Sequence, residues 1–228
     1  KNKRTCFGTL KDEANAWFVG EPFKVFYDYK KEGIWQLGEE ATAAANGQEP
    51  GDIKVQDVDG NGVITTDDRI IYSQRPDVTF GFNNTFNYKG FDLSVFLYAR
   101  LGQWIAYDYN TTYRINALEN GGNVDYWTPE NPTNAFPRPN KSKSYTQVTY
   151  YSTLKYEDGS FFKIRDITLG YTFKPELLKH LNLSRLRVYA TAKNFFTFSK
   201  IDNYDPEQGG SISFPMTKQL VFGLNVEF

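Results

Sequence analysis

Residues 79–101 read TFGFNNTFNYKGFDLSVFLYARL, and apolar side chains recur at every second position through most of this stretch. Such alternation is typical of a β-strand with one apolar face. Only Lys89 and Gly90 separate its two halves, so we predict an antiparallel hairpin with a tight turn. The apolar face of this hairpin would carry Phe80, Phe82, Phe86, Tyr88, Phe91, Leu93, Val95, Leu97, Ala99 and Leu101.

The same period continues further along the chain. The sequence predicts an all-β arrangement with five strands in region 79–228, at about 79–88, 91–103, 160–173, 185–198 and 216–228. Between them, residues 103–158 and 199–215 are long polar inserts, and residues 174–184 are a short connection that could hold one helical turn starting at Pro175. Region 1–78 is expected to be a long structured loop, with a short helical candidate at 39–47.

Two kinds of protein have strands of this pattern. A soluble β-sandwich buries the apolar face in its core, whereas a membrane β-barrel turns it towards lipid. The predicted strands span about 10–13 residues, against about 5–6 in soluble sheets and about 9–11 for a tilted spanning strand. Short and long connections also alternate, as they do in outer-membrane barrels. We therefore favour the barrel; because about eight strands are needed to close one, the chain would be part of a larger barrel.

Composition excludes several classes of function. The chain has 228 residues with 26 Lys and Arg against 27 Asp and Glu, so it lacks the basic surplus of a nucleic-acid-binding protein. A single cysteine, Cys6, and a single histidine, His180, exclude a disulfide framework, a Cys/His zinc site and a histidine-based triad within this chain. No catalytic set is visible, and we expect no enzymatic activity.

The stretch DVDGNGVITTDD at 57–68 resembles the calcium loop of an EF-hand. That loop places ligands at positions 1, 3, 5, 7, 9 and 12, with glycine at position 6 for a sharp turn. Gly62 occupies the turn position, and position 12 carries Asp instead of the usual Glu, whose longer side chain binds both oxygens more readily. An Asx-rich turn without an ion is the alternative. The candidate ligands for a structural Ca²⁺ are Asp57, Asp59, Asn61, the Val63 carbonyl, Thr65 through a water molecule, and Asp68.

Aromatic residues gather in the insert at 103–158. Aromatic faces stack on sugar rings, so these residues are candidates for contact with a substrate or a partner protein. The alternative is packing within the loop, or, for Trp104 and Tyr107, a place in an aromatic girdle at a membrane interface. The candidates are Trp104, Tyr107, Tyr109, Tyr113, Tyr126 and Trp127.

Seven motifs carry a resemblance to a known family. From about Phe23 to Phe228 the chain resembles the C-terminal portion of SusC-like (SusC/RagA) TonB-dependent outer-membrane transporters. The order and spacing of the motifs match that family closely. They read PGDIKVQDVDGNGVITTDDR, DVTFGFNNTFNYKGFDLSVFLYAR, YWTPENPTNAFPR, EDGSFFKIRDITLGYTF, RLRVYATAKNFFTFSK, YDPE and FGLNVEF.

The resemblance implies a fold and a set of partners. It implies the last strands of a 22-stranded antiparallel transmembrane β-barrel in the outer membrane of a Gram-negative cell, with long extracellular loops, short periplasmic turns and a periplasmic C-terminus. Region 1–78 would be extracellular. The plug and the TonB-binding segment of the family are not in this chain. The implied partners are outer-membrane lipid, the rest of the barrel and its plug, TonB, and a SusD-like surface lipoprotein.

The resemblance also implies import of oligosaccharides, or of peptides in some branches of the family. Arg100, Arg165, Asp166, Arg187 and Lys193 would face inward and pair with the plug or with one another. A soluble, secreted, calcium-containing β-sandwich that binds carbohydrate is the alternative outside the family.

Overall fold

The computed structural model describes residues 11–23, 25–116, 121–179 and 182–228, so Cys6 and His180 lie outside the described residues. Within these ranges, no helix is both long and apolar enough to cross a membrane. The chain divides into two compact units. The loop unit comprises residues 1–75, 104–157 and 210–212, and the sheet unit comprises residues 76–103, 158–209 and 213–228.

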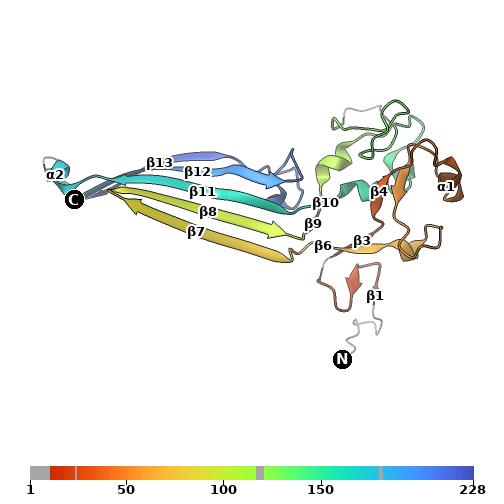
Figure 1. Cartoon of the computed structure of the whole chain (residues 1–228), viewed down its shortest axis with the longest axis horizontal. Coiled ribbons are helices and arrows are strands. Elements are labelled where there is room, and N and C mark those ends of the chain that lie inside the picture. Colours follow the sequence, from red (N-terminus) through yellow and green to blue (C-terminus); the bar gives the residue numbers. More distant parts are fainter. Residues whose placement is uncertain (1–10, 24, 117–120, 180–181) are drawn as a thin grey trace. The chain divides into compact units, whose positions relative to one another are not determined.

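The sheet unit is built on one five-stranded antiparallel sheet (Figure 1). Its strands overlap the five ranges expected from the alternation of apolar residues. In spatial order they are β13 (Gln219–Glu227), β12 (Arg185–Ser199), β11 (Phe161–Thr172), β8 (Phe91–Leu101) and β7 (Val78–Tyr88).

The turns between neighbouring strands agree with the sequence. Lys89 and Gly90 join β7 to β8 with φ values of 47° and 90°, as the two central residues of a type I′ hairpin turn require. A Cβ atom on Gly90 would lie 2.8 Å from the Thr172 carbonyl oxygen, so a larger residue would collide with the backbone. The short helix α2 (Pro175–Leu178) begins at Pro175 as predicted and lies in the connection between β11 and β12.

One face of the sheet is apolar across all five strands. In one row, Phe82 lies opposite Leu97, Leu97 opposite Ile164, and Ile164 opposite Phe196. A second row joins Leu169, Ala190 and Phe222. We call this the apolar face; Leu169 keeps 52% and Phe222 73% of its surface exposed. The sheet therefore presents a broad apolar surface instead of enclosing a core.

The opposite face carries the ion pairs and most of the polar side chains of the sheet, together with aromatic residues such as Phe96 and Tyr98. Arg187 donates two hydrogen bonds to Asp92, from Nε to Oδ1 at 2.9 Å and from Nη2 to Oδ2 at 2.5 Å. Thr168 and Thr191 share a hydrogen bond of 2.8 Å between their hydroxyl groups.

The inward-facing charges named from the sequence all lie on this polar side and have partners. Lys193 lies 3.9 Å from Asp166, and Arg165 pairs with Glu207 at 3.1 Å. Arg100 donates from Nε to the Tyr98 hydroxyl group at 2.7 Å.

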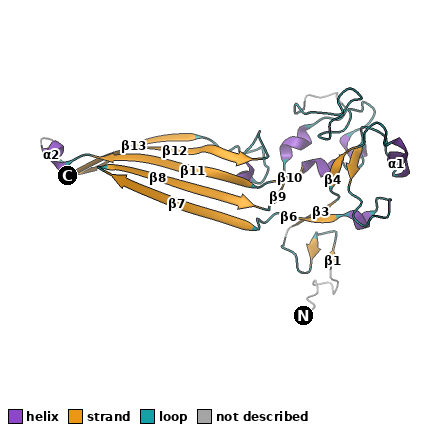
Figure 2. Cartoon of the chain, in the orientation of Figure 1, coloured by secondary structure: helices purple, strands orange, loops and turns teal. Residues whose placement is uncertain are grey.

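Among its described residues, the loop unit contains four two-stranded sheets, one short α-helix and several 3-10 turns, joined by long irregular segments (Figure 2). The helix α1 (Glu40–Ala45) lies within the predicted helical segment at 39–47. The strand pairs are β1 (Lys11–Asp12) with β2 (Trp17–Phe18), β3 (Val25–Asp28) with β6 (Ile70–Ser73), β4 (Lys31–Ile34) with β5 (Ile53–Val55), and β9 (Trp104–Ala106) with β10 (Tyr156–Asp158).

The core of the loop unit joins the N-terminal region to the insert at 103–158. Ile34 and Ile53 from one strand pair pack with Trp127 and Leu154 from the insert, and each is at most 4% exposed. Trp127 also donates from Nε1 to Gln36 Oε1 at 2.8 Å. Burying one such side chain contributes about 1.5–3 kcal/mol, so this cluster stabilises the contact between the two segments.

Candidate functional site

The acidic loop at 57–68 is shaped by hydrogen bonds from its own backbone. Asp57 accepts from Gly60 N to Oδ1 and from Gly62 N to Oδ2, both at 2.7 Å. Asn61 Oδ1 accepts from Val63 N at 2.7 Å. The two glycines have φ values of 72° and 85°, a conformation that residues with a Cβ atom rarely adopt.

Asp68 closes the loop from inside. Its carboxylate is buried and accepts from Val58 N and Thr65 N, both at 2.7 Å, and from Asp59 N at 3.4 Å. Residues 66–68 form a 3-10 turn in which Thr65 and Asp68 cap each other. The hydrogen bond from the Thr65 backbone, followed by those from Val58 and Asp59, lowers the pKa of Asp68.

The fold brings three carboxylates of the loop together. Asp57, Asp59 and Asp68 each offer one oxygen, and these oxygens lie within 4.8 Å of one another. Carboxylate oxygens are ligands that Ca²⁺ prefers, and it takes about six to eight oxygens in all. At Asp57 and Asp59 each carboxylate oxygen accepts a single hydrogen bond and keeps a second lone pair for a cation. Asp68 Oδ1 already accepts two backbone N–H groups. The donor set therefore fits a hard divalent cation.

Replacing Asp68 with alanine is expected to open this loop. Three backbone N–H groups would lose a buried acceptor, at a cost of about 1–3 kcal/mol each if water does not replace it. We expect the initial rate of proteolysis within residues 50–75 to rise at least about tenfold, since about 1.4 kcal/mol corresponds to a factor of ten in an opening equilibrium. Limited proteolysis followed by mass spectrometry measures this rate.

Asp67→Ala is the matched control, because Asp67 is the exposed neighbour of Asp68. It should leave the rate unchanged, and equal rates for the two variants would contradict the role of Asp68.

The stability of the wild-type loop should also depend on pH. Because the pKa of folded Asp68 lies below its unfolded value, the stabilisation is complete above about pH 4 and is lost as the pH falls through the lower folded value.

The aromatic candidates of the insert do not share one environment. Trp127, Tyr107 and Tyr113 are buried, at 4–6% exposed, and Tyr113 donates its hydroxyl to the Pro137 carbonyl at 3.0 Å. Trp104 and Tyr109 are half-buried, and the ring of Trp104 packs edge-on against Tyr72 at 4.8 Å between centroids. Tyr126 keeps 43% of its surface exposed. Substrate contact stays a prediction, and Tyr126 has the most open surface for it.

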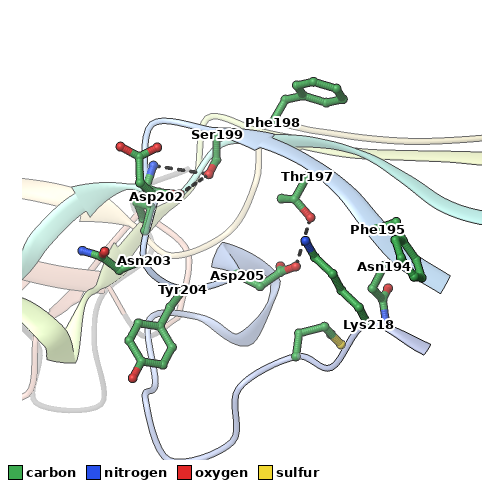
Figure 3. A pocket seen from close by; sticks show the side chains of 12 residues that line it. Asn194, Phe195, Thr197, Phe198, Ser199, Asp202, Asn203, Tyr204, Asp205 and Lys218 are labelled. Atoms are coloured by element: carbon green, nitrogen blue, oxygen red, sulfur yellow. Dashed lines mark hydrogen bonds between the residues drawn. The ribbon is translucent and has the colours of Figure 1, made fainter. Parts of the chain in front are cut away.

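A network of ion pairs connects the segment after β12 to β11. The sequence analysis did not predict this network. Lys163 is fully buried, and its Nζ lies 2.6 Å from Asp205 Oδ2 and 2.7 Å from Glu207 Oε2. Arg165 pairs with the other oxygen of Glu207. Asp205 also accepts from the Thr197 hydroxyl at 3.2 Å (Figure 3). We call Lys163, Arg165, Asp205 and Glu207 the latch; the only signal for it in the sequence was the YDPE motif at 204–207.

Comparisons with known proteins show that this chain is similar to part of several TonB-dependent receptors. The chain is 32% identical to TonB-dependent receptor P3 of Formosa agariphila over 92% of its own length and 22% of that protein. It is 31% identical to TonB-dependent receptor SusC of Bacteroides thetaiotaomicron, over 75% of this chain and 17% of SusC. No protein-family model matches the chain. These relatives are named as receptors, which is consistent with the expectation that the chain is not an enzyme.

Solved structures show the same relationship. A structure of the RagAB peptide importer in its open-open state aligns with a TM-score of 0.64 and 26% identity, over 93% of this chain and 23% of the matched chain. A structure of the RagAB peptide transporter aligns with a TM-score of 0.69 at 24% identity. The chain spans about a fifth of the curated relatives that it matches. It is homologous to part of the SusC-like TonB-dependent receptors, as its motifs predicted.

Proposed function

We propose that this chain forms part of the wall and the loops of an outer-membrane importer driven through TonB. The observation that carries the proposal is the apolar face, which runs over five long antiparallel strands and keeps residues such as Phe82, Leu169 and Phe222 exposed. Hydrocarbon is the solvent that suits such a face. The similarity to TonB-dependent receptors and SusC supports the same role.

This role implies further strands, a plug and a partner protein. Five strands leave two open edges, β7 and β13, whose backbone groups need partners inside a membrane. We propose that further strands of a 22-stranded barrel pair with them, and that the polar face lies against the plug. Short turns and the C-terminus would be periplasmic, and the long inserts would be extracellular, where a SusD-like lipoprotein covers the substrate.

An oligosaccharide is the substrate that we propose first, since the exposed ring of Tyr126 in the insert suits stacking on a sugar. A peptide is the second candidate. The observation that favours it is the similarity to structures of RagAB, which is a peptide transporter and importer.

Uptake by cells tests the proposed function. Deleting the gene that encodes the protein containing this chain should abolish growth on one class of nutrient, and the intact gene should restore it. Cultures supplied with oligosaccharide mixtures or with peptide mixtures as sole source separate the two candidates. Affinity purification of the intact protein from outer membranes should recover a surface lipoprotein. Unchanged growth on every source would contradict the role in import.

We further propose that the acidic loop binds Ca²⁺ as a structural ion. The support is the cluster of Asp57, Asp59 and Asp68, whose like charges repel one another unless a cation neutralises them. Asn61, the Val63 carbonyl and Thr65 would complete the ligands. The ion would supply rigidity to the loop and no chemistry.

Calcium is expected to protect the loop from proteases. With about 5 mM CaCl₂, above a Kd of about 10⁻⁴–10⁻³ M for weak extracellular sites, cleavage within residues 50–75 should be several-fold slower than in EDTA. Asp59→Ala should remove this difference, because it deletes one ligand of the cluster and leaves the hydrogen bonds to Asp68 in place. Equal cleavage of the wild-type protein in calcium and in EDTA would refute the ion.

A further inference from the structure

Aromatic rings gather at one end of the apolar face. Tyr88 lies opposite Phe91, and Phe91 lies opposite Tyr171, so these residues form one row across β7, β8 and β11. The ring centroids of Phe91 and Tyr171 are 4.7 Å apart, and those of Tyr171 and Phe173 are 5.0 Å apart. Aromatic side chains of membrane proteins gather at the level of the lipid headgroups. This row therefore indicates where the apolar face meets the surface of the membrane.

Lysine side chains lie at the same end of the sheet. Lys89 follows Tyr88, and its Nζ atom lies 5.1 Å from the centre of the Tyr88 ring. Lys174 follows Phe173, directly before α2, and its side chain is exposed. The helix α2 and the turn after β7 lie at one end of the sheet (Figure 1).

The acidic side chains at this end do not cancel the positive charge. Asp92 pairs with Arg187, and Glu227 pairs with Arg185. Among the described residues of the two turns, three exposed lysines then stand against one acid, Glu176; they are Lys89, Lys174 and Lys179. Such a basic surplus at a membrane surface attracts the phosphate groups of lipids.

A hollow of about 270 Å³ lies next to the aromatic row. It is found at Ala190, which lies between Leu169 and Phe222 across β11, β12 and β13 and has a much smaller side chain than either. Phe91 and Tyr171 also line it, and the lining is almost entirely apolar. Leu169 is two residues further from the turns than Tyr171, which is about 7 Å along the strand. The hollow therefore lies at the level of acyl chains when the aromatic row lies at the level of headgroups.

We propose that this hollow and the lysines of the two turns together bind one phospholipid. An acyl chain occupies the hollow at Ala190, and the phosphate group lies nearer the turns, beside Lys89 and Lys174. The proposal rests on the proposed place of the sheet in the outer membrane and adds a specific lipid site to it. A phospholipid matches both parts of the site, because its negative phosphate group is joined directly to chains that avoid water. Diacylglycerol matches only the hollow, and free glycerol phosphate matches only the lysines.

Native mass spectrometry of the full-length transporter in detergent tests the site, with dioleoylphosphatidylglycerol as the probe. The wild-type protein should bind one molecule at least about tenfold more tightly than it binds dioleoylglycerol, which lacks the phosphate group. It should not bind glycerol 3-phosphate, which lacks the chains. Equal affinity for the two lipids would overturn the role of the lysines, and binding of glycerol 3-phosphate would overturn the role of the hollow.

Variants locate the two parts of the site. Ala190→Phe fills the hollow with a ring and should weaken binding of the probe at least about tenfold. Ala192→Phe is the matched control, since Ala192 lies on the same face two residues along β12 and does not line the hollow. Lys89→Gln should weaken binding about fivefold, whereas Lys141→Gln, at an exposed position of the insert, should leave it unchanged. The comparison of lipids needs only the wild-type protein, so it decides the question if Ala190→Phe does not assemble.

The same spectra reveal a different occupant of the hollow. A dimer mass that Ala190→Phe abolishes would assign the hollow to a second copy of the chain, and equal binding by the wild type and Ala190→Phe would remove the acyl chain from it. Either result, with a transporter that still supports growth, overturns the lipid site and leaves the import function standing. A transporter that binds the probe as expected but supports growth on no nutrient would contradict the import function alone.

Discussion

Replacing Lys163 with methionine is expected to destabilise the sheet unit by about 3–5 kcal/mol, the cost of leaving buried charges without a partner. Lys163 is fully buried, and Asp205 and Glu207 are at most 12% exposed. Removal of the ammonium group leaves Asp205 without this cation and leaves Glu207 with Arg165 alone. Methionine keeps most of the length of the side chain, so the loss of charge dominates. The midpoint of urea unfolding of the full-length transporter and the cleavage of residues 199–215 by proteases both report the effect.

Two further variants distinguish the latch from a general loss of charge. Arg185→Ala breaks an ion pair with Glu227 in which both side chains are more than half exposed, and it should change stability by at most about 1 kcal/mol. Combining Lys163→Met with Asp205→Asn and Glu207→Gln should recover much of the lost stability, because no buried carboxylate is then left without a cation. A Lys163→Met protein as stable as the wild type would show that the latch does not hold the segment.

The second large effect concerns the apolar face. Phe222→Arg is expected to cost about 2–4 kcal/mol if residue 222 lies near the middle of the bilayer, with a smaller cost near its surface. Phe222 is 73% exposed on this face, so in water the same change would relieve an unfavourable exposure. The fraction of protein assembled in outer membranes, and urea unfolding in lipid vesicles, measure the difference.

The neighbouring residue supplies the control. Val221 lies opposite Thr191 on the polar face, and Val221→Arg places the same charge on the other side of the strand. It should assemble like the wild type. If instead Phe222→Arg assembles fully and Val221→Arg fails, the faces are assigned the wrong way round, and the apolar face packs against protein.

The sequence alone was enough to locate the five strands of the sheet unit, but not the short strands of the loop unit. Alternation with period two depends only on neighbouring residues, which is why the ranges around Phe80 to Leu101 and the turn at Lys89 could be found without coordinates. The acidic loop could be recognised from neighbouring residues in the same way. Asp57, Gly62 and Asp68 lie within twelve residues, and their spacing predicted the turn.

The tertiary structure decided which side chains are buried and which meet across long stretches of chain. Trp127 could have been a surface aromatic or part of a core, and packing against Ile34 and Ile53 made it core. Lys163 and Asp205 meet across 42 residues, and β12 extends beyond its last pair with β13, which joins Lys193 to Gln219. Local periodicity carries no information about such contacts, because they exist only after distant segments have paired and excluded water.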